Sequence, residues 1–593
     1  MHALLEFPFD SDIILQKQKR IRRELLEQGN LDTKKIAILG GSTISEIKNI
    51  LELFLLNYGI LPEFYESEYG LYWEEAVFEN EYLEKWKPDI VFIHTCNRNI
   101  KQMPSVMDSS ETVQSIIETE YNRFKKMWES LEERYHCIII QNNFEMPFYR
   151  LYGNQDACNI HGRSYVINEL NRLFSQYALE KKNFYIHDIN YLSAVYGIKR
   201  WSNPTYWYMY KYALEVPAIP SFCYSLANII KSIYGKNKKV LMLDLDNILW
   251  GGVIGEDGIE HIEIGAETSV GQAYYEFQEY VKKLSEMGVV LTINSKNDYE
   301  NALLGLNHPD GVLGKDDFAI IMANWDNKDV NALKTAEALD LSTDSFVFVD
   351  DNPVERALVK NGIEGIMVPD IDKIEKAVRM IDEAGYFEKT LLSDEDYERN
   401  NMYKHKVERE TIKQSIMDYT TYLKSLKMHA VIRPFEDAYM SRIAQLTNKS
   451  NQFNLTTKRY TEAEIKQIST REDSICLYGR LSDRFGDEGI VSVVIGFIDG
   501  EELKIQLWLM SCRVLKRNME MAMMDSLVQA ARNYGIQRIR GYYYKTKKNA
   551  MVKDFYGNFG FEKVAELENG DSEWMIETKA YTYCNEYITV EGV

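Results

Sequence analysis

An apolar run that ends in two aspartates constrains the fold of this chain more than any other segment. The run Val240–Leu243 is followed by Asp244 and Asp246, and Gly251 and Gly252 come a few residues later. Such a run bounded by glycine predicts a parallel strand that is buried on both faces. Side chains alternate along a strand, so both aspartates are expected on one side of its carboxyl end, where open α/β sheets bind ligands.

Two carboxylates held this close repel each other unless a cation lies between them or one of them is protonated. Either outcome can serve chemistry, with one carboxylate as nucleophile, the other as acid/base, and a hard cation such as Mg²⁺ bridging to a phosphate. The alternative is that Asp244 and Asp246 only cap the following helix. The pair by itself leaves both interpretations open.

Three later segments supply the other parts that such a site needs. A second apolar strand ends in a cluster of hydroxyl and amide groups that can bind phosphate, and a lysine before a helical pattern can neutralise a transferring phosphoryl group. These predicted phosphate-binding residues are Ser295, Lys296, Asn297 and Lys328. A third strand at 345–349 ends in Asp350 and Asp351, a carboxylate pair suited to complete a Mg²⁺ shell.

The order strand–Asp-x-Asp, strand–Ser, Lys and strand–Asp-Asp resembles the four signature motifs of the haloacid dehalogenase superfamily of phosphohydrolases. The motifs at 244–258, 295–297, 348–356, 451–457 and 483–489 are similar to those of the FkbH-like proteins, in subfamily IIIC. The upstream third also resembles the longer members, so the likeness covers most of the chain.

This resemblance implies a phosphatase-like domain that removes phosphate from 1,3-bisphosphoglycerate, a three-carbon acid, and leaves a glyceryl thioester on the phosphopantetheine arm of an acyl carrier protein. It implies that Asp244 is the nucleophile, Asp246 the acid/base and Lys328 a further catalytic residue. The implied Mg²⁺ ligands are Asp244, Asp246, Asp350 and Asp351.

Two positions depart from the FkbH-like pattern. Members usually carry Thr where this chain has Ile248, which deletes a hydroxyl and one local hydrogen bond worth about 1 kcal/mol. The second departure is Asn294. Many members carry Cys where this chain has Asn294, and that thiol is a candidate acyl carrier in the family. Asparagine cannot form a thioester. Either the acyl group moves directly to the partner thiol, or the substrate differs.

Composition favours an intracellular enzyme with several domains. The 593 residues are enough for three to four domains, and the seven cysteines lack the spacing of a zinc site or a disulfide framework. The N-terminus lacks the features of a signal peptide, and no apolar run reaches the ~20 residues of a membrane span. The net charge of −21 argues against a nucleic-acid binder. We therefore expect a cytoplasmic protein with neither nucleic-acid nor membrane partners.

Residues 1–235 alternate apolar strands with helix-length segments, which predicts a parallel α/β sheet. A Gly-Ser turn after the first strand contains Ser42, and Asn97 follows a later strand, in a pattern that resembles SGNH-type hydrolases. There a downstream Asp-x-x-His completes the triad, but here His187 and Asp188 stand in reverse order. A serine without its base is not activated, so a docking or substrate-positioning domain is favoured over a catalytic Ser42.

Residues 391–415 are polar and dense in charge, which predicts a linker helix. Beyond it, residues 416–593 contain apolar strands at 490–495 and 503–508 and a long helix from about 518 to 533. This arrangement resembles the GNAT acyltransferase fold.

In that fold an Arg/Gln-x-x-Gly-x-Gly turn offers backbone N–H groups to the pyrophosphate of coenzyme A. This chain keeps Arg513 but has Lys516 and Asn518 in place of the glycines, which favours a pantetheine arm over coenzyme A. Basic residues gather here and can steer an acidic carrier, although solvated cations at a helix end explain them equally well. The predicted carrier-docking residues are Arg513, Lys516 and Arg517, in a cluster with Arg532, Arg538, Arg540, Lys545, Lys547 and Lys548.

Together these features predict a multidomain α/β protein. Its parts are a flavodoxin/SGNH-like domain at 1–235, a Rossmann-like haloacid dehalogenase domain at 236–390, the linker helix at 391–415 and a GNAT-like α+β domain at 416–593. The expected function is Mg²⁺-dependent phosphoryl chemistry on a small phosphorylated acid, coupled to carrier loading. The alternatives are a GNAT-type acyltransferase, and a carrier-binding scaffold with a silent phosphatase domain.

Overall fold

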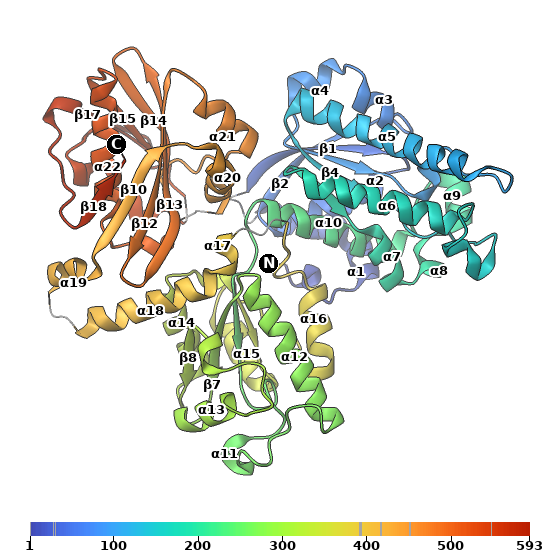
Figure 1. Cartoon of the computed structure of the whole chain (residues 1–593), viewed down its shortest axis with the longest axis horizontal. Helices are drawn as coiled ribbons and strands as arrows, with labels where there is room; N and C mark the ends of the chain where they lie inside the picture. The colour runs from blue at the N-terminus through green and yellow to red at the C-terminus, as the bar shows by residue number, and fades with distance from the viewer. Residues whose placement is uncertain are drawn as a thin grey trace. The chain divides into compact units, whose positions relative to one another are not determined.

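The computed structural model describes residues 2–27, 29, 31–390, 394–415, 418–449, 452–546 and 548–592 (Figure 1). The chain divides into two compact units, with the division between Ser232 and Ile233. The first unit contains one sheet, and the second contains two. No helix in the described ranges is long and apolar enough to cross a bilayer.

The first unit is built on a five-stranded parallel sheet in the order β2-β1-β3-β4-β5. The strands are β1 (Asp32–Gly40), β2 (Ile60–Glu66), β3 (Ile90–His94), β4 (Ile138–Asn142) and β5 (Phe184–His187). This confirms the parallel sheet predicted for the first part of the chain. The edge strand β2 was not predicted, because Pro62 and two glutamates interrupt its apolar pattern, as is usual for an edge strand.

Helices cover both faces of this sheet. On one face, Trp128 and Phe174 pack edge to face with ring centroids 4.8 Å apart, and both belong to the core cluster that contains Val91 and Ile93. On the other face, Phe222 packs against Phe92 of β3. The helices are α1 (Ser11–Glu27), α2 (Ser45–Asn57), α3 (Tyr72–Val77), α4 (Glu81–Trp86), α5 (Ser110–Tyr135), α6 (Arg163–Glu180), α7 (Ile189–Tyr196), α8 (Ile198–Trp201), α9 (Pro204–Tyr210) and α10 (Ile219–Ile233).

The second unit begins with a four-stranded parallel sheet in the order β8-β7-β6-β9. Its strands are β6 (Val240–Leu243), β7 (Val290–Ser295), β8 (Ile320–Ala323) and β9 (Phe346–Val349). The three strands predicted to end in polar site residues are therefore confirmed as parallel neighbours, with β6 between β7 and β9. The structure adds β8 at the edge.

Helices also pack on both faces of this four-stranded sheet. Met242 and Phe348 lie in a core cluster with residues of α14, α15 and α18, and α12 lies on the opposite side of the sheet (Figure 1). The helices are α11 (Ile254–Asp257), α12 (Ser269–Glu286), α13 (Tyr299–Leu306), α14 (Lys328–Leu339), α15 (Pro353–Gly362), α16 (Ala377–Glu383), α17 (Asp394–Tyr397) and α18 (Arg399–Ser415).

The predicted linker helix corresponds to α17 and α18, while residues 391–393 of that prediction lie outside the described residues. Helix α18 is not a freely solvated linker. Its Asn400 side chain is buried and donates hydrogen bonds to Ser285 Oγ (3.0 Å) and Asp317 O (2.7 Å) of the parallel-sheet domain. Near its other end, Arg409 is buried against Asp483 of the C-terminal sheet. The polar residues of α18 therefore make contacts with both domains of the second unit.

The C-terminal part forms a mixed sheet with the strand path β16-β17-β15-β14-β13-β12-β10-β18. Its strands are β10 (Met428–Pro434), β11 (Phe453–Asn454), β12 (Ser474–Asp483), β13 (Gly486–Asp499), β14 (Glu502–Met510), β15 (Arg538–Tyr543), β16 (Glu562–Glu566), β17 (Ser572–Glu577) and β18 (Ile588–Glu591). The helices are α19 (Tyr419–Leu426), α20 (Met440–Lys449), α21 (Glu462–Ser469) and α22 (Met519–Asn533). The strands predicted at 490–495 and 503–508 and the long helix are confirmed as β13, β14 and α22.

Candidate functional site

The predicted acidic and polar residues meet at the carboxyl edge of the four-stranded sheet. Asp244 directly follows the central strand β6, Ser295 is the last residue of β7, and Asp350 directly follows β9. The Asp244 backbone N–H donates to Val349 O at 3.0 Å, which holds the ends of β6 and β9 together. Because β6 lies between β7 and β9, Asp244 occupies the middle of the site.

Lys328 is the cation of this site. It is the first residue of α14, and its buried Nζ donates to Asp244 Oδ2 at 2.7 Å and to Asp350 Oδ2 at 2.5 Å. Burial alone would lower the pKa of Lys328, but the two carboxylates outweigh that effect and raise it. The lysine therefore stays charged and neutralises part of the acidic cluster.

Three carboxylates form a candidate metal centre. Asp244, Asp350 and Asp351 each offer an oxygen, and these oxygens lie within 4.8 Å of one another. Burial, followed by the charge of Asp244, raises the pKa of Asp350 to about 6 and also raises the pKa of Asp351. A divalent cation would relieve this repulsion. All three donors are hard oxygens, the ligand type that Mg²⁺ prefers, so the residues fit the predicted ion.

The Asp246 carboxylate is not in this group of three, although it was predicted as a ligand. Its Oδ1 accepts hydrogen bonds from Trp250 Nε1 (2.9 Å) and Ile254 N (3.1 Å), and its Oδ2 accepts one from Asn297 Nδ2 (3.1 Å). Burial is the main cause that raises the pKa of Asp246. A fixed carboxyl group with a raised pKa suits proton transfer better than metal binding.

The predicted phosphate-binding residues occupy different environments. Ser295 is buried at the end of β7, beside the central strand, and Asn297 is bonded to Asp246. Lys296 instead forms an ion pair with Glu355 at 2.7 Å. Its charge is therefore neutralised within the protein, and Lys328 is the better placed of the two lysines to meet a phosphoryl group.

Asn294 has a role that the sequence did not reveal. Its side chain is fully buried, and its Nδ2 donates a hydrogen bond of 2.8 Å to the backbone oxygen of Lys328. The amide therefore fixes the start of α14 and with it the lysine. Asn294 thus positions Lys328, and its own side chain is not exposed.

Arg356 and Asn247 also support the site and were not predicted. The Arg356 Nη1 donates to the backbone oxygens of Asp350 (3.0 Å) and Asp351 (2.6 Å), which fixes the loop after β9. Asn247 has a left-handed backbone (φ 57°), and its Oδ1 accepts a hydrogen bond from Gly252 N at 3.0 Å. Asn tolerates this conformation. The Asn two residues before the Leu-Trp-Gly-Gly run was therefore the sequence signal that could have indicated a turn at this position.

The predicted carrier-docking residues are mostly buried. Arg517 donates to Asp483 Oδ2 (2.7 Å) and Glu488 Oε1 (2.9 Å), and Arg409 of α18 pairs with the same two carboxylates. Arg513 is buried as well, whereas Lys516 is exposed. Lys547 of the predicted basic cluster lies outside the described residues. This differs from the expected docking surface, because neither arginine faces solvent.

The turn before α22 keeps a backbone that glycine would favour. Lys516 and Asn518 both have φ of 61°, in the left-handed region. These are the two positions where the sequence pattern places glycines. The side chains of Lys516 and Asn518 therefore occupy a turn whose backbone form is preserved.

A short strand lies between the diverging strands β14 and β15. Those two strands pair in parallel only at 502–504 with 538–540. Farther along, Leu455 N donates to Trp508 O (3.0 Å), and Tyr544 N donates to Leu455 O (2.8 Å). The β11 segment thus bridges the gap between β14 and the end of β15 with its own backbone.

Ser42 lacks a catalytic partner among the described residues. Its side chain is buried, and its Oγ has no hydrogen-bond partner. His187 Nδ1 is bonded to Asn142 Oδ1 at 3.0 Å, while Asp188 accepts a hydrogen bond from Asn143 Nδ2 at 2.7 Å. These contacts leave neither residue in a triad with the serine.

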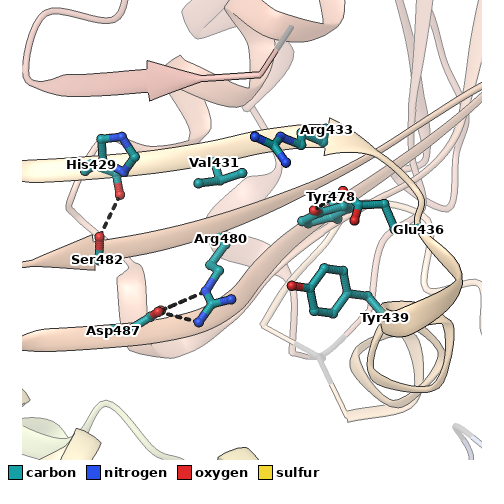
Figure 2. A pocket seen from close by; sticks show the side chains of 9 residues that line it. All are labelled: His429, Val431, Arg433, Glu436, Tyr439, Tyr478, Arg480, Ser482 and Asp487. Carbon is teal, nitrogen blue, oxygen red and sulfur yellow. Dashed lines mark hydrogen bonds and ion pairs between the residues drawn. The ribbon is translucent and has the colours of Figure 1, made fainter.

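A groove of about 320 Å³ lies on the outer face of β10 and β12 (Figure 2). Its charged groups are already paired. Arg480 Nη2 donates to Asp487 Oδ2 at 2.5 Å, and the Tyr478 hydroxyl donates to Glu436 at 2.7 Å. Because these charged groups are paired with each other, the groove is a weaker candidate for a catalytic site than the edge of the parallel sheet. Its lining residues are His429, Val431, Arg433, Glu436, Tyr439, Tyr478, Arg480, Ser482 and Asp487.

Two family models match the chain, one on each side of the division between Ser232 and Ile233. Residues 35–231 match the family model for the FkbH N-terminal domain, and residues 239–370 match the model for NLI interacting factor-like phosphatases. A crystal structure of the N-terminal part of the protein BF1531 from Bacteroides fragilis, which contains a phosphatase domain complexed with Mg, is 26% identical with a TM-score of 0.58. The match covers 63% of this chain and 99% of that one.

Two acetyltransferase structures resemble a quarter of the chain. Ard1 from Thermoplasma volcanium is 18% identical (TM-score 0.20), and the PaiA N-acetyltransferase from Thermoplasma acidophilum, in complex with coenzyme A, is 13% identical (TM-score 0.19). Each covers 25% of this chain, and the matches cover 97% and 98% of those chains. These likenesses are too weak to assign a function. No curated protein matches the chain. The chain therefore contains an FkbH N-terminal domain followed by a phosphatase domain of the haloacid dehalogenase type.

Proposed function

We propose that this protein is a Mg²⁺-dependent phosphatase and acyl-transfer enzyme of the FkbH-like type. The observation that carries the proposal is the placement of Lys328 between Asp244 and Asp350, with Asp351 close enough to share a cation. A purely structural Asp-x-Asp cap would not require a buried lysine and two further carboxylates. The arrangement therefore supports phosphoryl transfer over the capping alternative.

The residues divide the chemistry between them. Asp244 is the proposed nucleophile toward phosphorus, and the Lys328 ammonium offsets the negative charge that develops on the phosphoryl oxygens. Asp246, held by Trp250 and Asn297, donates a proton to the leaving oxygen and later takes one from water. A bound Mg²⁺, held by Asp244, Asp350 and Asp351, would supply further charge neutralisation at the phosphoryl group.

The finer proposal concerns the substrate. In the FkbH-like resemblance, 1,3-bisphosphoglycerate gives a glyceryl thioester on an acyl carrier protein. The pantetheine thiol attacks the acyl phosphate and displaces one phosphate, and hydrolysis of the 3-phosphate releases a second. Because Asn294 is buried and bonded to Lys328, we propose that the acyl group passes directly to the carrier thiol, with no acyl adduct on this chain.

Mass spectrometry of the carrier tests this proposal. A phosphopantetheinylated carrier incubated with the protein, Mg²⁺ and 1,3-bisphosphoglycerate should gain one glyceryl mass while about two phosphates are released for each glyceryl group. The Asp244→Asn variant should give no enzymatic release from the 3-position. Phosphate release without any carrier adduct would show that the substrate is a free small molecule. An acyl adduct on the enzyme itself would exclude direct transfer.

The main alternative is an acyltransferase centred on the C-terminal sheet. The strand path and the parallel β14–β15 pair support a GNAT-like fold. Two features count against coenzyme A as its ligand: the side chains of Lys516 and Asn518 stand at the glycine positions, and Leu455 bridges the gap between β14 and β15. We therefore assign the chemistry to the parallel-sheet domain.

A further inference from the structure

A basic and aromatic surface lies at the carboxyl edge of the first sheet, outside the phosphoryl site. We call it the rim and define it as residues 97–101, 146–163 and 196–212, which come after β3, β4 and β5. The rim has one acidic residue, Asp156, which is buried and accepts a hydrogen bond from Ser164 N at 2.8 Å. Its seven cations are Arg98, Lys101, Arg150, Arg163, Lys199, Arg200 and Lys211. The charge of the rim is thus opposite to the net −21 of the chain.

Direct contacts hold the three segments of the rim together. The Arg98 guanidinium lies 4.8 Å from the Trp207 ring centroid and 5.3 Å from that of Phe148, so one side chain joins all three segments. The turn after β1 also contacts the rim, because Thr43 N donates to Lys211 O (3.0 Å) and Thr43 Oγ1 donates to Tyr210 O (2.6 Å). The rim is therefore a single surface beside the Gly-Ser turn.

Ion pairs do not hold the cations of the rim in the described ranges, although Arg98 lies near the buried Glu145 carboxyl. Within the ranges that the structure describes, none of the seven rim cations has a carboxylate within salt-bridge distance. Five of them lie over aromatic rings instead: Arg98, Lys101, Arg163, Arg200 and Lys211. Unpaired cations gathered on one surface attract an acidic partner and raise its rate of association.

The rim also exposes large apolar side chains. Helix α9 has no buried residue, although five of its seven residues are Tyr, Trp or Met. Tyr208 is 66% exposed, Met209 is 63% exposed, and Leu151 is 67% exposed. Clustered apolar exposure of this kind marks an interaction site, and Tyr, Trp, Met and Arg are the residue types enriched at protein interfaces. Within the stretch 201–212, Trp201 is buried, whereas residues 204–206 and 208–210 are exposed.

We propose that the rim is the surface on which an acidic acyl carrier protein docks, an inference that rests on the proposed loading function. Its unpaired cations complement an acidic protein, and its exposed Leu151 and Met209 suit the apolar side chains of a protein surface better than a phosphate backbone. Of the C-terminal arginines expected to dock the carrier, Arg517 is buried in ion pairs and Arg513 is buried as well. The rim thus provides the accessible positive surface that carrier recognition requires.

Binding of a purified type II acyl carrier protein, in phosphopantetheinylated form, to the full chain tests the inference. The rim variant is Arg150→Glu with Arg163→Glu and Lys211→Glu, where glutamate at position 163 also suits the first turn of α6. The matched control reverses Lys17, Lys19 and Arg23, three exposed cations of α1 that form no ion pair with the residues described by the structure. Fluorescence anisotropy at low salt should show a Kd raised at least ~10-fold by the rim variant and changed less than ~2-fold by the control.

A second variant tests the apolar part of the rim. Tyr208→Ser with Met209→Ser should also weaken carrier binding several-fold without changing the charge. Both rim variants should release phosphate from an aryl phosphate at the wild-type rate, because no rim residue belongs to the phosphoryl site. This measurement shows that the second unit remains folded, and wild-type hydrogen exchange in β1–β5 should show the same for the first unit, which contains the rim.

The outcomes separate the two proposals. Carrier binding without glyceryl loading by the wild type would refute the proposed function and leave the docking surface standing. Loading that the rim variants do not affect would refute the docking surface and leave the function standing. Absence of carrier binding by the wild type, or tighter binding of single-stranded DNA or anionic lipid vesicles than of the carrier, would overturn the inference.

Discussion

The buried lysine of the phosphoryl site gives the sharpest test of the structural account. Lys328→Met removes an ammonium that lies 2.7 Å from Asp244 and 2.5 Å from Asp350, and all three side chains are buried. Removing one partner of a buried ion pair costs about 3–5 kcal/mol, because charge is left without compensation. The local free energy of unfolding around β6 and β9 should fall by this amount at pH 8 in a metal chelator.

A matched control lies on the same helix. Lys334 pairs with Asp326 at 2.8 Å, but both side chains are about half exposed, so Lys334→Met should cost no more than ~1 kcal/mol. Amide hydrogen exchange of peptides that contain β6 and β9 should accelerate by roughly two to four orders of magnitude in Lys328→Met and by less than one order in Lys334→Met. At pH 5 the difference should shrink, because Asp350, whose pKa is raised to about 6, takes up a proton. Equal exchange in both variants at pH 8 would refute the reasoning.

Three further predictions concern other parts of the chain. Ser42→Ala should leave phosphate release near the wild-type rate, and labelling of Ser42 by a fluorophosphonate would contradict its inactive role. Burial lowers the pKa of His94 and of His187 to about 3. In the unfolded chain both imidazoles take up a proton near pH 6.5, so the folded protein keeps its full stability above that pH and loses stability as the pH falls from 6.5 toward 3. His187→Gln should therefore weaken the acid sensitivity of hydrogen exchange in β3–β5, and an unchanged pH profile would count against this. Arg517→Met should destabilise β13 by ~3–5 kcal/mol in hydrogen exchange, and exposed Lys516→Met by less than ~0.5 kcal/mol; similar losses would show that the arginine is not held in a buried network.

The sequence predicted that the candidate site residues would lie together because these residues follow strand ends. Asp244, Ser295 and Asp350 each come at or directly after an apolar run, and parallel strands bring such positions to one edge of a sheet. The spacing also indicated the lysine. It did not indicate that Lys328 would contact both Asp244, 84 residues away, and Asp350, since such contacts depend on how α14 packs.

The docking prediction shows where composition is insufficient. Basic residues gathered near 513–517 suggested a positive surface, but Arg517 is neutralised by Asp483 and Glu488, which lie 34 and 29 residues earlier. Arg409, on the predicted linker helix, completes the same network. Whether an arginine faces solvent or a buried carboxylate depends on tertiary packing that charge counts do not contain.

The role of Asn294 could not be predicted for a similar reason. The family pattern suggested that this position contacts the acyl group. Side chains alternate along β7, however, so Asn294 and Ser295 point to opposite sides of the strand. Ser295 ends the strand toward the site, while Asn294 turns to the backbone of Lys328. One step along a strand separates Ser295, which is proposed to bind phosphate, from Asn294, which positions the lysine.

Phosphate release from an aryl phosphate, measured with Mg²⁺, with chelator and with Zn²⁺, tests the central claim most directly. The account predicts release with Mg²⁺, loss on chelation, recovery on adding Mg²⁺, and loss of at least ~100-fold in Asp244→Asn, while Asp326→Asn, an exposed change in the same domain, retains activity. Equal phosphate release by wild type and Asp244→Asn, or recovery with Zn²⁺ but not with Mg²⁺, would contradict it.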